Sequence, residues 1–340
     1  MGQATAEALR VVADGGILEE FLAESVMDDI MTGETTPAQM GALLMGLRIR
    51  GETAAELAGF ARSMRRHAAT VEVSRRPLLD TCGTGGDGSH SFNISTVAAL
   101  VAAGAGATVV KHGNRAATST SGSADVLEAL GVSLDPGPEV LAAMLEETGF
   151  AFLYAQSVHR AMRFAAPVRR EMGIRTVFNL LGPLTNPAGP ERQLLGLYDA
   201  RYLPLMAEAL LRLGVDQAIV VHGDGLDEVT LAGVTQYVRV DGDRLESGRL
   251  TAADLDLPSH PLDAVVGGSP AANAEICRRV LAGEHGPHRD VVLANAGVAL
   301  WAARVASSPA SGVALARESI DTGRAAWVLE RLGQLSSQAP

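Results

Sequence analysis

Lysine is almost absent from this chain. Lys111 is the only lysine among 28 lysine and arginine residues. It follows the apolar run 107–110 and opens the segment Lys111-His112-Gly113-Asn114-Arg115. Lysine is a compact point charge on a thin stem, whereas arginine carries a wide planar fork, and phosphate loops commonly use the compact charge. Either arginine does not fit here, or this is a surviving surface lysine in a composition biased to Ala, Gly and Arg.

Cysteines, aromatic residues and long apolar segments are also scarce. Aromatic residues make up 4% of a chain that is 47% hydrophobic, so we expect a large core built mostly of Ala, Leu and Val. The two cysteines, Cys82 and Cys277, favour neither a disulfide framework nor a metal site. The longest weakly polar run, residues 97–110, is too short for a membrane span. Residues 1–10 do not resemble a signal peptide, so we expect a cytoplasmic protein.

Positive charge is in deficit overall. The formal net charge is −11 at pH 7. This balance argues against a general surface for nucleic acid or for anionic membranes. A cationic site is therefore expected only as a local pocket.

The length of 340 residues suggests about two domains. Residues 1–72 show only helical patterns, with capping boxes that begin at Thr36 and Thr53. Residues 73–340 alternate short apolar runs with helical patterns, which predicts an α/β domain with a mostly parallel central sheet. We expect strands at 78–80, 107–110, 193–197, 218–221 and 236–240. We expect helices at 94–103, 124–130, 203–213, 271–282, 291–303 and 313–332.

A glycine-rich turn, Gly83-Thr84-Gly85-Gly86-Asp87-Gly88, follows the first expected strand and precedes a helix. Glycines let backbone N–H groups approach a phosphate closely, and the helix start adds donors and a favourable dipole. The turn lacks the ending of a P-loop, and Asp87 would repel the pyrophosphate in a Rossmann loop. Asn93-Ile94-Ser95-Thr96 opens the helix, either as ordinary capping or as ligands for phosphate oxygens or a metal.

Polar residues follow two further strands. Lys111 to Arg115 leads into the hydroxyl-rich stretch 118–123, which is either a phosphate loop or a flexible serine loop. Asp227 and Glu228 follow the strand at 218–221. They are either solvated loop carboxylates or ligands for Mg²⁺, which prefers oxygen ligands and shares them with substrate phosphates.

The middle of the chain offers a site for a carboxylate. Arg169 can present a bidentate fork, with His159 ten residues before it, although a surface helix with an ion pair would look the same. Residues 178–187 favour a rigid turn that either walls an aromatic pocket or joins two elements.

Together these motifs closely resemble the anthranilate phosphoribosyltransferase family of the tryptophan pathway. The likeness extends over essentially the whole chain and includes 83–87, 93–96, 111–115, 121–131, 168–187, 225–228 and 315–321. It implies a helical domain completed by mid-chain helices at about 160–185, beside a large catalytic α/β domain. It also implies a homodimer formed through the helical domain, and transfer of phosphoribose from phosphoribosyl pyrophosphate to the anthranilate amine.

The resemblance assigns site residues in three groups. Phosphoribosyl pyrophosphate would be bound by Gly83, Gly86, Asp87, Ser91, Asn93, Ile94, Ser95, Thr96, Lys111, His112, Gly113, Asn114, Arg115, Ala116, Ala117, Thr118, Ser119 and Ser123. Anthranilate would be bound by Gly83, Asn114, His159, Arg169 and Pro183. Mg²⁺ would be held by Ser95, Asp227 and Glu228.

The chain departs from the family at three positions. Arg160 stands where proline is common, Thr120 where lysine is common, and Thr118 replaces a serine. One rival is a pyrimidine nucleoside phosphorylase, which shares the architecture but typically has Lys-His-Ser after the strand. The other is an inactive relative that binds nucleic acid, which the net charge opposes.

Overall fold

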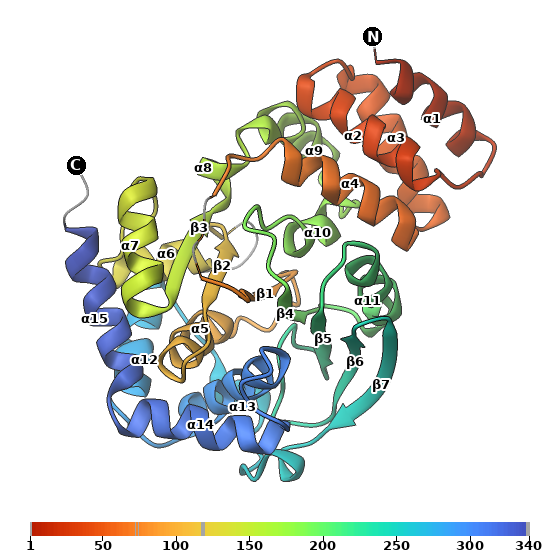
Figure 1. The fold of residues 1–340 in the computed structure, drawn as a ribbon. Coiled ribbons are helices and arrows are strands. Elements are labelled where there is room, and N and C mark those ends of the chain that lie inside the picture. The colour runs from red at the N-terminus through yellow and green to blue at the C-terminus, as the bar shows by residue number, and fades with distance from the viewer. Residues whose placement is uncertain (1, 72, 74, 117–119, 338–340) are drawn as a thin grey trace.

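A single seven-stranded sheet organises the larger part of the molecule. The computed structural model describes residues 2–71, 73, 75–116 and 120–337. The strand order is β3-β2-β1-β4-β5-β6-β7 (Figure 1). The first five of these strands run parallel, and β6 and β7 are antiparallel to their neighbours. The strands are β1 (Leu79–Gly83), β2 (Val109–Gly113), β3 (Phe150–Tyr154), β4 (Arg192–Gly196), β5 (Gln217–Gly223), β6 (Thr235–Asp241) and β7 (Arg244–Leu250).

One face of the sheet is covered by a single hydrophobic core, and the other by a large core and a smaller cluster at β2 and β3. Leu194 and Ile219 belong to one core, whereas the adjacent residues Leu195 and Val220 belong to the other. This alternation is the two-residue period of a strand that is buried on both faces. The first core is completed by α5 (Ile94–Gly104), α6 (Ser123–Ala129), α7 (Pro138–Thr148), α12 (Pro270–Leu281), α13 (Pro287–Ala302), α14 (Pro309–Asp321) and α15 (Arg324–Ser336).

The second core joins the sheet to the N-terminal helices, which project beyond one corner of the sheet (Figure 1). The helices on this side are α1 (Gln3–Ala13), α2 (Glu20–Thr32), α3 (Pro37–Arg50), α4 (Ala54–Arg66) and α11 (Leu203–Arg212). Both predicted capping boxes are confirmed: the Thr36 side chain accepts the Gln39 N–H, and the Thr53 side chain accepts the Glu56 N–H.

The chain returns to the N-terminal helices in its middle. After β3 it forms α8 (Ala155–Val158), a 3-10 turn at Arg160–Phe164, α9 (Ala166–Met172), α10 (Phe178–Leu181) and a second 3-10 turn at Gly182–Leu184. The first 3-10 turn packs on α2, and α9 packs on α3. Buried Ala165 and Val168 belong to the same core as the N-terminal helices.

The expected fold class is confirmed by this architecture, although α7 and several other elements were not expected. Strands β3 and β7 were not predicted, and the single helix expected at 313–332 is two helices. Gly323 separates α14 from α15 because it takes the left-handed conformation, with φ of 75°. Among the described residues, no helix has both the length and the apolar character needed to cross a bilayer.

Candidate active site

The predicted site lies where the strand order reverses. Strands β2 and β3 lie on one side of β1, and β4 and β5 lie on its other side. The order of the strands in the sheet therefore changes direction after β3. Ligands of open α/β sheets bind beyond the carboxyl ends of the strands at such a switch point. Gly83 ends β1 and Gly196 ends β4, and the two residues are register partners. A Cβ at Gly83 would lie 2.2 Å from Asp227 Oδ2, so glycine is required for the close approach of that carboxylate.

The glycine-rich turn presents unpaired donors. Gly85, Gly86 and Gly88 all have positive φ, between 67° and 76°, which side chains at these positions would disfavour. The Gly85 N–H donates to Asp227 Oδ2 at 2.6 Å. Within the described part of the chain, the N–H groups of Gly86, Asp87 and Gly88 donate to no protein acceptor. Consecutive free N–H groups in such a turn form a concavity suited to an anion.

Three carboxylates converge beside this turn. Asp87 Oδ2 accepts the Asp227 N–H at 3.2 Å, and Glu228 Oε1 accepts the Ser95 N–H at 3.0 Å. Loss of hydration, and then the negative charge of Asp87, raise the pKa of Asp227 to about 7. Burial, and then the negative charge of Asp227, raise the pKa of Glu228 to about 8, although Lys111 opposes this shift. Glu228 is buried, so the alternative of a solvated loop carboxylate is wrong for it. This excess of negative charge suits a divalent cation with oxygen ligands.

Lys111 is an internal lysine. Its side chain is 2% exposed, so the alternative of a surface lysine is wrong. The ammonium donates to the Thr81 carbonyl oxygen and lies 3.3 Å from Ser95 Oγ. Its charge also lowers the pKa values of Asp80 and Glu228 below what burial alone would give. Lys111 therefore lies beneath the start of α5, next to two of the three predicted metal ligands.

The start of α5 is built from side chains that are already paired. Asn93 makes no capping hydrogen bond with its side chain. Instead its amide donates to the Ser121 carbonyl at 3.0 Å, and its Oδ1 accepts from Ser121 Oγ and from Asn273 Nδ2. Ile94 and Thr96 are buried, so a ligand could reach only their backbone. Ser91 forms an isolated bridge with Val266.

Several polar groups of residues 114–116, directly after β2, are already paired within the protein. Asn114 Oδ1 accepts the Arg115 N–H at 2.8 Å. Arg115 pairs with Asp125 and Glu128 of α6, and the Ala116 N–H donates to Asp125. A Cβ at Gly113 would lie 2.2 Å from Ser123 Oγ, which brings the predicted residue Ser123 against the end of β2. The predicted residues Ala117, Thr118 and Ser119 lie outside the described residues.

The side chain of Arg169 lies against one aromatic ring, that of Phe178. Its guanidinium lies 5.0 Å from the centroid of the Phe178 ring, and burial lowers its pKa. Within the described residues it donates no hydrogen bond from its side chain, so the ion-pair alternative is wrong for it. Its donors remain available for a carboxylate.

Two histidines lie against the segment that carries Pro183. The rings of His112 and His159 are 5.1 Å apart, edge to face, and each has a buried Nε2 without a partner. Burial lowers the pKa of His112 to about 3 and that of His159 to about 4, so both are neutral near pH 7. Pro183 is buried, and its carbonyl accepts from Gln193 at 2.7 Å. His159, which the resemblance assigns to the anthranilate site with Pro183, therefore lies beside the segment 182–185, together with His112.

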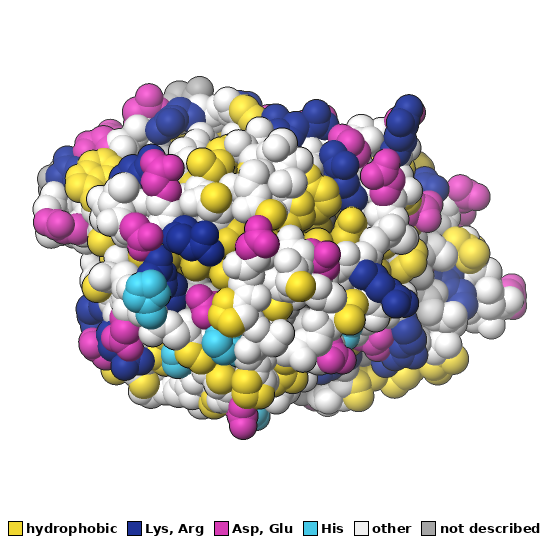
Figure 2. Space-filling model, turned by 90° about the horizontal axis from the view of Figure 1, so that it is seen from below, with side chains coloured by type: hydrophobic (Ala, Val, Ile, Leu, Met, Phe, Trp, Pro, Cys, Tyr) yellow, Lys and Arg dark blue, Asp and Glu magenta, His cyan; other side chains and the backbone are white. Residues whose placement is uncertain are grey.

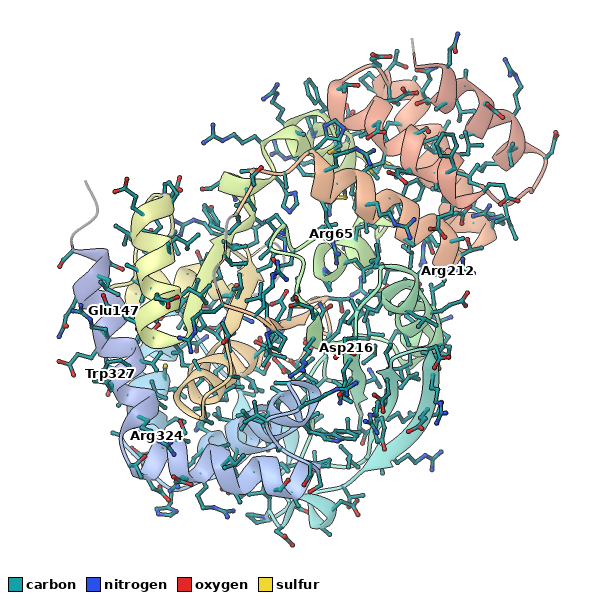
Figure 3. The ribbon with its side chains drawn as sticks, in the orientation of Figure 1. Arg65, Glu147, Arg212, Asp216, Arg324 and Trp327 are labelled. Carbon is teal, nitrogen blue, oxygen red and sulfur yellow. The ribbon has the colours of Figure 1, made fainter. Side chains whose placement is uncertain are left out.

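Sequence reasoning missed several residues that build the site. Thr84 accepts the Tyr198 N–H, Arg175 donates to the Gly86 carbonyl, and Asp80 accepts from the His112 N–H and from Asn186. Arg65 extends from α4 toward this edge of the sheet, where its Nε donates to the Leu184 carbonyl at 2.8 Å (Figure 3). Thr84, Arg175 and Asn186 stand in stretches named from the sequence, and Asp80 and Arg65 do not, but no local pattern shows which partners any of them contacts.

One hollow on the described surface lies away from this edge of the sheet. It has a volume of about 280 Å³ and is lined by residues that include Glu147, Arg324 and Trp327 (Figure 3). Its other residues include Ala107 and Gly149, which precede β2 and β3. It is therefore at the amino-terminal edge of the sheet, opposite the predicted site, and contains none of the predicted residues.

Comparisons with known proteins identify the family of this chain. Residues 75–326 match the family described as glycosyl transferase family, a/b domain, and residues 6–68 match its helical bundle domain. An anthranilate phosphoribosyltransferase of Symbiobacterium thermophilum is 52% identical over 329 residues, covering 96% of each chain.

Solved structures show the same similarity. The anthranilate phosphoribosyltransferase of Thermus thermophilus is 48% identical, with a TM-score of 0.92 over 97% of this chain and 99% of that one. The Saccharomyces cerevisiae enzyme in complex with PRPP and Mg is 28% identical, with a TM-score of 0.89 over 98% of each chain. The chain therefore belongs to the anthranilate phosphoribosyltransferase family, within the glycosyl transferase family.

Proposed function

We propose that this chain transfers phosphoribose from phosphoribosyl pyrophosphate to the amine of anthranilate, a step of tryptophan biosynthesis. The products are N-(5-phosphoribosyl)anthranilate and pyrophosphate. The observation that carries the proposal is the convergence, at one edge of the sheet, of a turn with free N–H groups and the buried Glu228 beside Asp227. Arg169, with unpaired donors, lies on the segment that reaches the same turn through Arg175.

Phosphoribosyl pyrophosphate is expected to bind along the turn and the ends of β1 and β2. The free N–H groups of Gly86, Asp87 and Gly88 can donate to its pyrophosphate oxygens. Lys111 is already close to Ser95, so its charge acts on the same region without direct exposure. Asn114, Ser123 and the backbone after Lys111 remain proposed contacts for the other end of the substrate.

The site residues fit a magnesium ion. Ser95, Asp227 and Glu228 supply oxygen atoms only, which is the donor set that Mg²⁺ prefers. Burial and the neighbouring negative charges raise the pKa values of Asp227 and Glu228, and a cation between them would favour their ionised forms. Among the described residues, no group of three or more His, Cys, Asp and Glu side chains is arranged to hold a metal. A site with two carboxylates relies on substrate oxygens for the rest. The ion would neutralise charge on the leaving pyrophosphate.

Anthranilate is expected to lie between Arg169 and the histidine pair. The free donors of Arg169 suit its carboxylate, and the neutral rings of His112 and His159 with Pro183 suit its aromatic ring. Gly83 and Asn114 are the proposed neighbours on the side of the phosphoribosyl group.

The chemistry is then mostly positioning and electrostatics. The N–H groups of the turn and the charge of Lys111 stabilise the departing pyrophosphate, while the anomeric carbon of the ribose gains positive character. Arg169 binds the carboxylate of anthranilate and thereby directs the amine toward that carbon. An aromatic amine is neutral at pH 7, so the attack needs no strong general base.

Two features weigh against the rival functions. The family match and the relatives' names favour the transferase over a pyrimidine nucleoside phosphorylase. On the face shown in Figure 2, arginines stand among aspartates and glutamates, and do not form a separate basic field for nucleic acid. Location in the cytoplasm stays a prediction from the sequence.

A homodimer through the N-terminal helices is also part of the proposal. Ile17, Phe21 and Ile49 are 60%, 80% and 79% exposed, which is unusual for large apolar side chains. Arg50 donates to the Gly16 carbonyl at 2.5 Å, which ties the segment that carries Ile17 to the end of α3, where Ile49 lies. A second copy of this chain would cover them.

The experiment that tests the function is identification of the product. The purified protein is incubated with phosphoribosyl pyrophosphate, MgCl₂ and anthranilate, and phosphoribosyl anthranilate is detected by mass spectrometry with release of pyrophosphate. Phosphorolysis of a pyrimidine nucleoside with inorganic phosphate, without this product, would favour the rival enzyme.

A further inference from the structure

Arg175 touches the glycine-rich turn from outside the sheet. It lies between α9 and α10, on the segment that also carries Arg169. Its Nη2 donates to the Gly86 carbonyl oxygen, and its guanidinium lies 4.1 Å from the centroid of the Tyr198 ring. The Tyr198 N–H in turn donates to Thr84 Oγ1 at 3.1 Å, so the ring that supports Arg175 is itself tied to the turn.

The contact with Gly86 sets the direction of one peptide group. The Gly86 carbonyl and the Asp87 N–H belong to the same trans peptide, so they point in opposite directions. Because Arg175 takes the carbonyl, the Asp87 N–H points away from Arg175. Within the described residues that N–H has no protein acceptor.

Nothing else that the structure describes fixes this peptide through hydrogen bonds. Thr84 is held by Tyr198, and the Gly85 N–H is held by Asp227. Gly86 has φ of 75°, and glycine passes between left- and right-handed regions at little cost, so the conformation of Gly86 does not by itself fix the peptide. The Asp87 carboxylate is held by Ser89 and by the Asp227 N–H, but these bonds do not involve the peptide group. A Cβ at Gly86 would lie 3.2 Å from Arg175 Nη2, so the absence of a side chain also leaves room for the guanidinium.

We propose that Arg175 is a positioning residue that locks the Gly86–Asp87 peptide with its N–H directed at the pyrophosphate of the substrate. The inference rests on the proposed function and deepens it. Arg175 acts through the peptide and does not itself bind either substrate. If the peptide rotates, a carbonyl oxygen replaces a donor beside the phosphate, which weakens binding of phosphoribosyl pyrophosphate and leaves the anthranilate site intact.

The test compares Arg175→Ala, Arg175→Lys and the control Arg170→Ala, an exposed arginine of α9. Michaelis constants for both substrates are measured, together with binding of magnesium pyrophosphate by calorimetry. Loss of a charged hydrogen bond predicts that Arg175→Ala raises the Michaelis constant for phosphoribosyl pyrophosphate about tenfold or more. Pyrophosphate affinity should fall by a similar factor, and the Michaelis constant for anthranilate should change by less than about twofold.

The lysine variant tests whether Arg175 acts by donating to the Gly86 carbonyl. Its ammonium can still donate to the Gly86 carbonyl, so Arg175→Lys should recover most of the affinity, and Arg170→Ala should match the parent. A rise in the anthranilate constant alone would overturn the proposal, because Arg175 would then be a carboxylate ligand. Unchanged constants in Arg175→Ala, or a lysine variant as weak as the alanine variant, would also overturn it. If the parent protein does not use anthranilate, the proposed function fails, but the pyrophosphate titration still tests the peptide lock.

Discussion

Asp227 lies over the ends of two adjacent strands, with its carboxylate against Gly83 and its backbone carbonyl against Gly196, and the carboxylate accepts the Gly85 N–H at 2.6 Å. The glycines that end β1 and β4 make this possible, because a Cβ at Gly83 or Gly196 would overlap with Asp227. The proposed phosphate turn and the proposed metal ligands are therefore one connected unit.

Neutral replacements of the two carboxylates test the metal site. Asp227→Asn and Glu228→Gln keep their oxygen acceptors for the Gly85 and Ser95 N–H groups but lose their charge. We expect kcat to fall by at least about a hundredfold, as when a main electrostatic group is removed from an active site. The midpoint of thermal unfolding should not fall, because a buried charge is costly. Activity close to that of the parent at ordinary Mg²⁺ concentrations would contradict the assignment.

Lys111→Arg tests whether the single lysine is required by shape. The ammonium is buried and contacts the Thr81 carbonyl and Ser95, and the planar fork of arginine is wider than an ammonium. We expect a large loss of activity and a loss of about 1–3 kcal/mol in the free energy of unfolding, typical of overpacking. Lys111→Met keeps an unbranched side chain without the charge. It should lose activity, with a smaller fall in the free energy of unfolding than Lys111→Arg. If the activity of Lys111→Arg stays within a few-fold of that of the parent, the site does not require lysine at this position.

Arg169→Ala tests the carboxylate subsite. Its donors are unpaired among the described residues, so the main loss should be the bond to substrate. The Michaelis constant for anthranilate should rise about ten- to a hundredfold, as for a charged hydrogen bond, and that for phosphoribosyl pyrophosphate should barely change. The Michaelis constant for aniline, which lacks the carboxylate, should not change. Equal weakening of both substrates would place the anthranilate site elsewhere.

The buried histidine pair predicts acid sensitivity. Burial lowers the pKa of His159 from its usual 6.5 to about 4, so the unfolded chain takes up a proton first as the pH falls. The stability that the neutral ring contributes is present above about pH 6.5 and is lost as the pH falls toward 4, at about 1.4 kcal/mol per pKa unit. Unfolding by urea from pH 7 to pH 4.5 should show a shallower loss for His159→Phe than for the parent. The exposed control His90→Asn should follow the parent, and parallel curves for all three proteins would contradict the prediction.

Charged substitutions on the N-terminal helices test the dimer. Phe21 and Ile49 are the most exposed of the large apolar side chains in the described part of the chain. In light scattering, Phe21→Asp and Ile49→Asp should each have the mass of a monomer. Both side chains are exposed in the single chain, so the substitutions should not lower the temperature at which the monomer unfolds. The control is Val266→Asp, 45% exposed and away from these helices, which should leave the oligomeric state unchanged. Dimers that survive both helix variants would place the interface elsewhere.

Much of the fold follows from local pattern. The capping boxes at Thr36 and Thr53 and the run before Lys111 were enough to place α3, α4 and β2. Strand β7, in contrast, has mostly exposed residues, because it lies at the edge of the sheet and its polar pattern shows no core face. β3 has five residues, and such short apolar runs do not distinguish a strand from a helix.

The candidate site was predictable where it consists of contiguous motifs. The roles of Arg175, Asn273 and Gly196 depend on contacts between segments far apart in the chain, such as the bond from Asn273 to Asn93. Pairing also changes what a motif offers: Arg115 and Asn93 are largely used within the protein. A single sequence cannot report which donors remain free.

The central claim is most directly tested by following anthranilate fluorescence with the purified protein. With phosphoribosyl pyrophosphate and Mg²⁺ present, fluorescence should fall with time, and the loss should stop when either component is omitted or when Glu228→Gln replaces the parent. Stable fluorescence with all components present would contradict the account, as would a loss that does not depend on phosphoribosyl pyrophosphate.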